Sequence, residues 1–103
     1  MIQPKTIKQA ESYIEDYESK INRINEQIPN VRNEIDRLKK ISRIIVEANY
    51  EGIGIQRYLD CIDWMCPNLD NAIIKMEEHR GELTNNIGEY KQWIVDKKKN
   101  TGV

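Results

Sequence analysis

The chain has 103 residues, which leaves room for one domain and one core. Only 39% of the residues are hydrophobic while 32% are charged, a balance that suits amphipathic helices with much exposed surface better than a compact globule. The formal net charge of -1 excludes a protein whose overall field attracts nucleic acid or an anionic membrane.

The first residues carry no sign of a targeting segment. Residues 1–5 are followed by charged sequence rather than by an apolar stretch, so we expect neither a secretory signal nor a transmembrane helix. We therefore place the protein in a cytoplasm. The two cysteines, Cys61 and Cys66, are expected to be free thiols in such a reducing compartment.

From residue 7 onward, apolar residues repeat without interruption at alternating spacings of three and four residues. A repeat sustained over more than three or four heptads predicts a coiled-coil seam, because a period of 3.5 residues keeps one stripe facing a partner helix. We expect one long helix over about residues 6–49, with a seam that joins the subunits of a homo-oligomer. The seam residues are Ile7, Ile14, Ile21, Ile24, Ile28, Val31, Ile35 and Leu38.

Pro29 lies inside this repeat, where a proline costs a helix about 3 kcal/mol. The repeat keeps its phase from Ile28 to Val31, which favours one kinked helix. Such a helix would be roughly 60 Å long, at about 1.5 Å per residue. The alternative is a compact four-helix bundle in which the chain reverses at Pro29.

Three further segments are expected after the long helix. Gly52 and Gly54 predict a turn that reverses the chain, and a short connecting helix should follow over about residues 55–65. Pro67 should end that helix, and a third helix over about residues 68–97 should pack antiparallel to the first, before a basic tail at residues 97–103. The sequence thus predicts a single all-α domain over residues 1–103, an elongated antiparallel helical hairpin or coiled coil.

A basic stretch of the long helix is the natural place to look for phosphate binding. Its candidate contacts are Arg32, Lys39 and Arg43. Glu34 and Asp36, however, precede basic residues at spacings of three and four, which favours intrahelical ion pairs on a solvated surface.

No metal, cofactor or catalytic site is expected. Cys61, Cys66 and His79 are too few soft ligands for a structural zinc site, which usually has four. No nucleophile or orienting carboxylate can be identified in the sequence to accompany His79 as a general base.

Apolar residues are concentrated between Ile41 and Met65 beyond what one helical stripe needs. Aromatic and arginine side chains most often dominate protein interfaces, so we expect Tyr50, Arg57, Tyr58 and Trp64 to contact a protein partner. The alternative is that these residues form the packed head of the hairpin.

These patterns predict a non-enzymatic, oligomeric interaction protein, an adaptor or small inhibitor that binds a larger protein through its apolar head. One alternative is a regulator that binds nucleic acid through the basic stretch. Another is an oligomer that holds a small charged ligand between subunits, using tyrosines with Arg57 or Arg80. The abundance of Ile, Asn and Lys indicates an AT-rich genome and fits a protein of a mobile genetic element.

Overall fold

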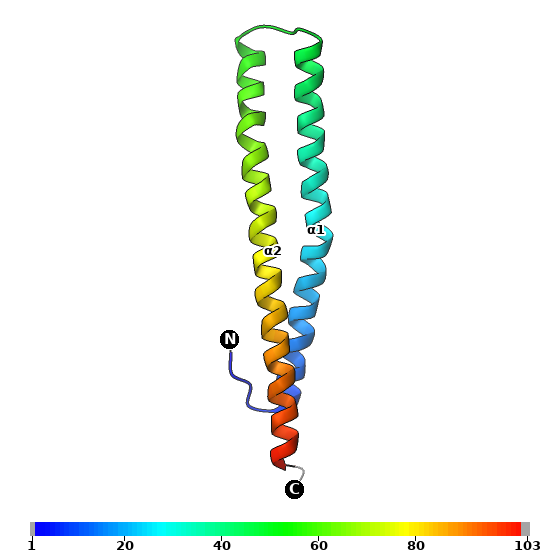
Figure 1. The fold of residues 1–103 in the computed structure, drawn as a ribbon, viewed down its shortest axis with the longest axis vertical. Helices are drawn as coiled ribbons and strands as arrows, with labels where there is room; N and C mark the ends of the chain where they lie inside the picture. Colours follow the sequence, from blue (N-terminus) through cyan, green and yellow to red (C-terminus); the bar gives the residue numbers. More distant parts are fainter. Residues whose placement is uncertain (1, 102–103) are drawn as a thin grey trace. The chain divides into compact units, whose positions relative to one another are not determined.

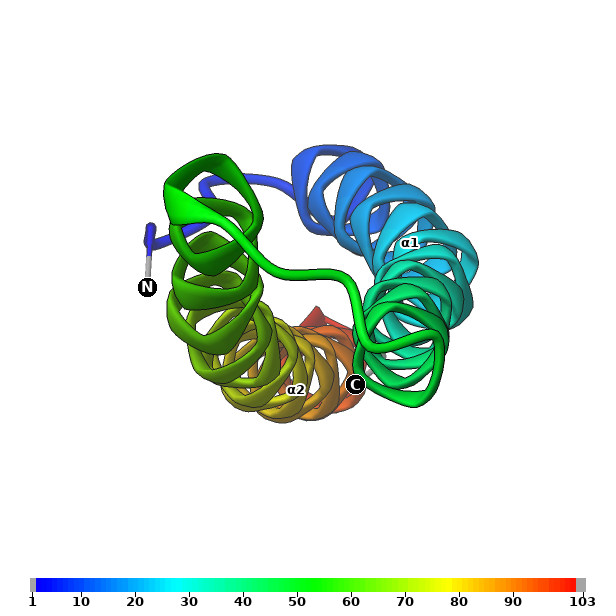
Figure 2. The same ribbon diagram turned by 90° about the horizontal axis from the view of Figure 1, so that it is seen from above.

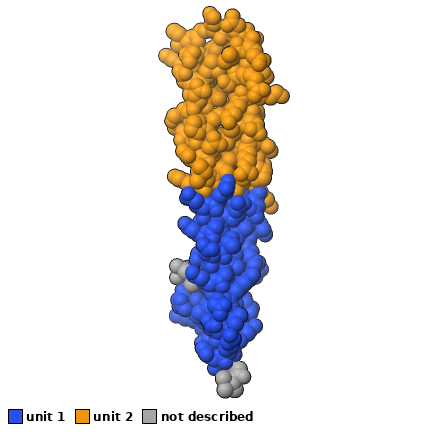
Figure 3. All heavy atoms as spheres, viewed as in Figure 1, with its two compact units in different colours: residues 1–25, 77–103 blue, residues 26–76 orange. Residues whose placement is uncertain are grey.

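The computed structural model describes residues 2–101, which form two helices joined by residues 48–52 (Figure 1). Helix α1 spans Ile7–Glu47 and helix α2 spans Ile53–Thr101. The chain divides into two compact units, and each contains a part of both helices (Figure 3). Unit 1 comprises residues 1–25 and 77–103, and unit 2 comprises residues 26–76. The prediction of an all-α helical hairpin is confirmed.

Helix α1 begins where a threonine caps it. The Thr6 Oγ1 atom accepts a hydrogen bond from the backbone N–H of Gln9 at 3.1 Å, and the Thr6 carbonyl accepts one from the N–H of Ala10 at 3.0 Å. The Gln9 side chain accepts a further hydrogen bond from the N–H of Lys5 at 2.7 Å. Together these bonds satisfy backbone donors that a helix leaves unpaired at its N-terminus.

The loop crosses from the end of α1 to the start of α2 (Figure 2), and it has a left-handed residue near its start. Asn49 has a φ of 57°, and the N–H of Tyr50 bonds back to the carbonyl of Ile45 at 3.3 Å, which is the pattern that ends many helices. Gly52 has a φ of 133°, a conformation that other residues rarely adopt, and its carbonyl accepts the N–H of Gln56 at the start of α2. The predicted reversal at this position is therefore confirmed.

Pro29 does not interrupt helix α1. Its ring lies on an exposed side of the helix, while the preceding Ile28 is only 4% exposed. Full burial of an apolar side chain contributes about 1.5–3 kcal/mol, so the seam residues on either side offset the cost of the proline. The alternative of a four-helix bundle broken at Pro29 is wrong.

The predicted helix boundary at Pro67 is also wrong, because α2 continues through it. The sequence contains the reason: Ile62, Cys66 and Leu69 keep the alternating spacing of four and three across Pro67, which itself is exposed. Ile62 and Cys66 are 3% and 8% exposed, so a break here would uncover them. The expected short helix and third helix are therefore one helix, which extends to Thr101.

In unit 2, the core lies along the line where the two helices meet. Three of the predicted seam residues of α1 are 4% exposed, and residues of α2 are buried with them. The buried set comprises Ile28, Ile35, Leu38, Ile62, Cys66 and Ile73. The chain therefore buries this part of the isoleucine repeat itself, against residues of its own second helix.

In unit 1, the core is built around tyrosines. The ring of Tyr90 is fully buried, with the rings of Tyr13 and Tyr17 at centroid distances of 5.4 and 5.7 Å. The Tyr90 hydroxyl donates a hydrogen bond to the carbonyl of Ile2 at 2.8 Å, and Pro4 is buried. This bond ties the segment that precedes α1 to helix α2. The predicted seam residues of this unit, Ile7, Ile14, Ile21 and Ile24, are half-buried.

The two helices of unit 1 run antiparallel, because Tyr13 contacts Tyr90 while Asn25, further along α1, bonds to Arg80, which is earlier in α2. This bond, from Arg80 Nη1 to Asn25 Oδ1, is 2.8 Å long. Arg80 occupies a seam position of α2 and is half-buried. A polar residue at such a position fixes the register of two helices, because a shifted pairing would leave it without its partner.

Replacing Pro67 by alanine should stabilise the protein. The variant regains a backbone donor inside α2 and loses the ring clash, while the unfolded chain becomes somewhat more flexible. We expect the free energy of unfolding in urea to rise by about 2 kcal/mol. Pro4→Ala is the control, since Pro4 precedes α1 and is buried, and it should not stabilise. A Pro67→Ala variant no more stable than the wild type would contradict this account.

Stability should fall between about pH 10 and 12 because of Tyr90. Burial, and then the neighbouring Tyr17 hydroxyl, raise the pKa of Tyr90 from 10.0 to about 12. A raised folded-state pKa means that the stabilisation is complete below the unfolded pKa and is lost as pH rises through the folded one. Tyr90→Phe should cost about 1 kcal/mol at neutral pH and should flatten the alkaline fall of the melting temperature. Tyr50→Phe, at an exposed tyrosine, should leave that fall as steep as in the wild type.

Candidate interaction surfaces

Exposed apolar side chains are concentrated in unit 2. Eight large hydrophobic residues there are between 36% and 75% exposed, whereas the described part of unit 1 adds only Ile2 and Val95. The eight are Ile44, Val46, Tyr50, Ile53, Tyr58, Trp64, Met65 and Ile74. Single exposed apolar residues are ordinary, whereas a concentration of them in one part of a chain is a common feature of interaction surfaces.

The residues predicted to contact a partner all lie in this region. Trp64, Tyr50 and Tyr58 are 71%, 63% and 45% exposed, and Arg57 is exposed as well. The alternative, that these residues form the packed head of the hairpin, is therefore wrong. The helices of unit 2 bury other residues between them and leave these four side chains exposed.

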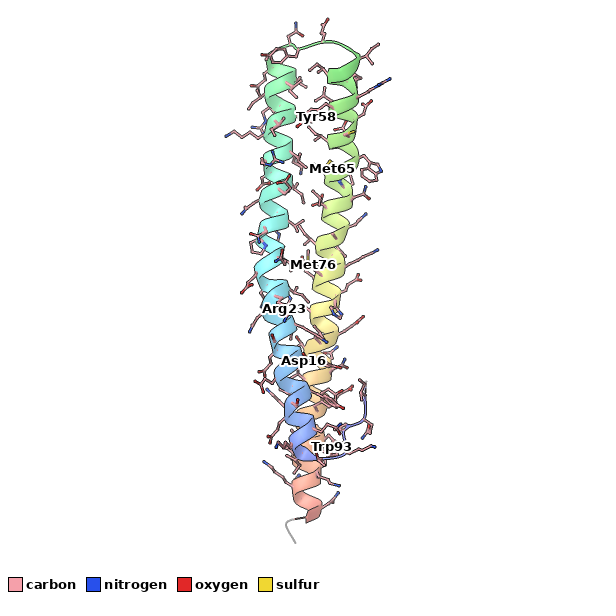
Figure 4. All side chains as sticks on the ribbon, turned by 180° about the vertical axis from the view of Figure 1, so that it is seen from behind. Asp16, Arg23, Tyr58, Met65, Met76 and Trp93 are labelled. Carbon is pink, nitrogen blue, oxygen red and sulfur yellow. The ribbon has the colours of Figure 1, made fainter. Side chains whose placement is uncertain are left out.

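The four residues do not form one face. Arg57 and Trp64 are seven residues apart on α2 and therefore point in the same direction. Tyr58 and Met65, also seven apart on α2 (Figure 4), share a second direction. Because each residue of a helix turns by about 100°, this direction differs by that angle from the first. Tyr50 lies in the loop. Helix α2 thus presents two separate surfaces near the loop.

The surface with Tyr58 and Met65 also includes part of α1. Lys39 and Asp63 each follow a buried seam residue, Leu38 and Ile62, and both line the same depression on one side of the seam. Arg37 and Met65 each precede a buried seam residue, Leu38 and Cys66, so they lie together on the other side. Ile44 follows Arg37 by seven residues and Ile41 follows it by four, so both isoleucines lie on that side. We call the set of Ile41, Ile44, Tyr58 and Met65 the flank face. Sequence reasoning missed it because it depends on which sides of the two helices meet.

Two of the three predicted phosphate contacts, Arg32 and Lys39, lie beside carboxylates. Arg32 and Lys39 line an open depression of about 440 Å³ together with Asp36 and Asp70. Lys39 also lines a second one of about 340 Å³, with Asp63 and Asp70. Arg32 and Lys39 are seven residues apart on α1, as are Asp63 and Asp70 on α2, so a basic stripe faces an acidic one. Arg43 is exposed and lines neither depression.

Facing stripes of opposite charge beside a seam orient the two helices of a coiled coil. They also reduce the attraction of this surface for phosphate, because the carboxylates repel it. The two facing stripes are thus suited to pairing α1 with α2. The acidic stripe could have been recognised in the sequence once the seam of α2 was known to run through Pro67.

An intrahelical ion pair accounts for two further charges of the basic stretch. Arg37 Nε donates a hydrogen bond to Glu34 Oε2 at 3.0 Å, and Arg37 Nη2 bonds to the other oxygen of the same carboxylate. The pKa of Glu34 is lowered by this hydrogen bond, and the pKa of Arg37 is raised by it. The spacing in the sequence predicted that Glu34 pairs with a basic residue of the same helix, and the structure contains this pair.

The two cysteines and the histidine, which were considered as metal ligands, do not form a common site. Cys66 is buried in the seam whereas Cys61 is exposed, and His79 is exposed with its Nδ1 atom 3.8 Å from Glu82 on the same helix. Within residues 2–101, no three His, Cys, Asp or Glu side chains gather closely enough to hold a metal ion.

Comparison of the chain with protein-family models, with curated proteins and with solved structures finds no match. Neither of the two described helices contains a stretch long and apolar enough to cross a membrane.

Reversing one charge of the acidic stripe should destabilise the hairpin. Asp70→Lys puts a third cation beside Arg32 and Lys39, so we expect the free energy of unfolding to fall by about 1 kcal/mol at low salt. In 1 M NaCl, where the Debye length is about 3 Å, most of this loss should disappear. Asn71→Lys, at the next residue and outside both depressions, is the matched control. Equal effects of the two variants would show that the stripes do not interact.

Proposed function

We propose that this chain is a non-enzymatic interaction protein, an oligomeric adaptor or small inhibitor that binds a larger protein through the exposed apolar surface of unit 2. The observation that carries the proposal is the exposure of Trp64. An indole that is 71% exposed leaves most of its apolar surface in water, although Trp is among the residues that contribute most when an interface buries them.

The neighbours of Trp64 support the same use. Arg57 lies two helical turns away on the same side of α2, and Tyr50 and Ile53, near the loop, are 63% and 75% exposed. An aromatic anchor beside an arginine is the composition typical of interface centres. We call Arg57 and Trp64 the outer surface of α2, and we propose that it contacts the partner.

Support for binding, rather than for chemistry, comes from how the ionisable groups are arranged. Arg37 is paired with Glu34, and the buried hydroxyl of Tyr90 donates to a backbone carbonyl. The tyrosine pKa of about 12 keeps that hydroxyl protonated at neutral pH. These groups have structural partners that account for them, whereas the exposed apolar side chains do not.

The proposal is tested by capture from a host lysate with matched variants. Immobilised wild-type protein should retain a specific protein, identified by mass spectrometry, and Trp64→Ala should weaken its binding by at least about 30-fold, the loss expected for an interface anchor of 2 kcal/mol. Val95→Ala removes apolar surface from the same helix outside unit 2, at a residue 44% exposed, and should bind normally. Retention that Trp64→Ala leaves unchanged would overturn the proposal.

A further inference from the structure

We infer that the flank face of unit 2, formed by Ile41, Ile44, Tyr58 and Met65, binds the same face of a second copy of this chain. This deepens the proposed function, of which self-association is a part, by assigning a different surface to it. The isoleucine repeat first expected to join subunits is used within the chain, since Ile28, Ile35 and Leu38 are each 4% exposed in a single copy. An oligomer therefore needs an apolar surface outside that seam.

At the flank face, half-buried seam residues adjoin exposed apolar side chains. Ile45, Ile55 and Leu59 occupy seam positions close to the loop, but each is only half-buried, in contrast to Ile62 at 3%. Beside them, Ile44, Tyr58 and Met65 are 52%, 45% and 36% exposed. Two helices shield each seam residue from one direction, whereas a four-helix arrangement closes the core from all sides. A second hairpin on the flank face would complete this part of the core.

The flank face has no charged member, which suits an identical partner. Across a two-fold axis, a residue close to the axis meets its own copy, so an unbalanced charge there would repel itself. The apolar members of the face carry no charge, and the neighbouring Arg37 is already neutralised by both oxygens of Glu34. The face is therefore complementary to itself, and a partner of strong charge of either sign would find no counterpart on it.

An interface of standard size takes about 800 Å² from each partner. A second copy would therefore have to cover the half-buried seam residues Ile45, Ile55 and Leu59 together with the exposed members of the flank face. The outer surface of α2 points in another direction and remains free for another protein.

Two neighbouring residues of α2 provide a matched test. Met65→Glu places a charge in the flank face, and Trp64→Glu places the same charge one residue earlier, about 100° around the helix and outside that face. The mass in solution is measured by light scattering at about 100 µM, with circular dichroism as the check on folding. For the wild type and Trp64→Glu we expect two copies, about 24 kDa, and for Met65→Glu one copy, at least 30-fold weaker in association.

A wild type that stays a single copy, a mass above two copies, or dispersal by Trp64→Glu but not by Met65→Glu would each overturn the inference. Should Met65→Glu lose helix content, Ile44→Glu on α1, at a residue 52% exposed, tests the same face from the other helix. The two proposals fail separately, because binding of another protein is followed with Trp64→Ala. A monomeric wild type that still captures its partner through Trp64 overturns the dimer alone.

Discussion

Burial of one apolar seam between two antiparallel helices is the constraint on which the other features depend. The seam repeats at spacings of three and four in α1, and the same repeat runs through α2 from Ile55 to Ile94. It explains why Pro29 and Pro67 are tolerated, because both lie on exposed sides while Ile28 and Cys66 beside them are buried. A local cost of about 3 kcal/mol per proline is small against the loss of a continuous core.

Polar residues give this apolar seam its specificity. Hydrophobic repeats alone permit shifted registers and other pairings of the same helices. Arg80 bonds to Asn25 at a seam position of unit 1, and in unit 2 the basic stripe with Arg32 and Lys39 faces the acidic stripe with Asp63 and Asp70. The charges that suggested a phosphate site in the sequence thus have a structural use, which is to select how α1 meets α2.

The two units differ in how much exposed apolar surface they have. Unit 1 is closed by a fully buried Tyr90, which also holds the segment before α1. Both units contain half-buried seam residues, but in unit 2 these residues adjoin a larger number of exposed apolar side chains. Exposed apolar area is costly in water, and its concentration in unit 2 is the basis of both proposed interactions. Trp64 and Met65, one residue apart, point in the two directions that these proposals assign to different partners.

The sequence by itself determined the helical class, the reversal near Gly52 and the seam of α1, because heptad spacing and glycine conformation are local properties. It also led us to predict that three aromatic residues of unit 2 contact a partner, and the structure shows that these residues are exposed. The tertiary structure decided what local rules could not: that α2 continues through Pro67, that three of the predicted oligomer residues are core, and which sides of α1 and α2 meet. Those outcomes depend on burial between residues far apart in the chain, which outweighs local helix propensity.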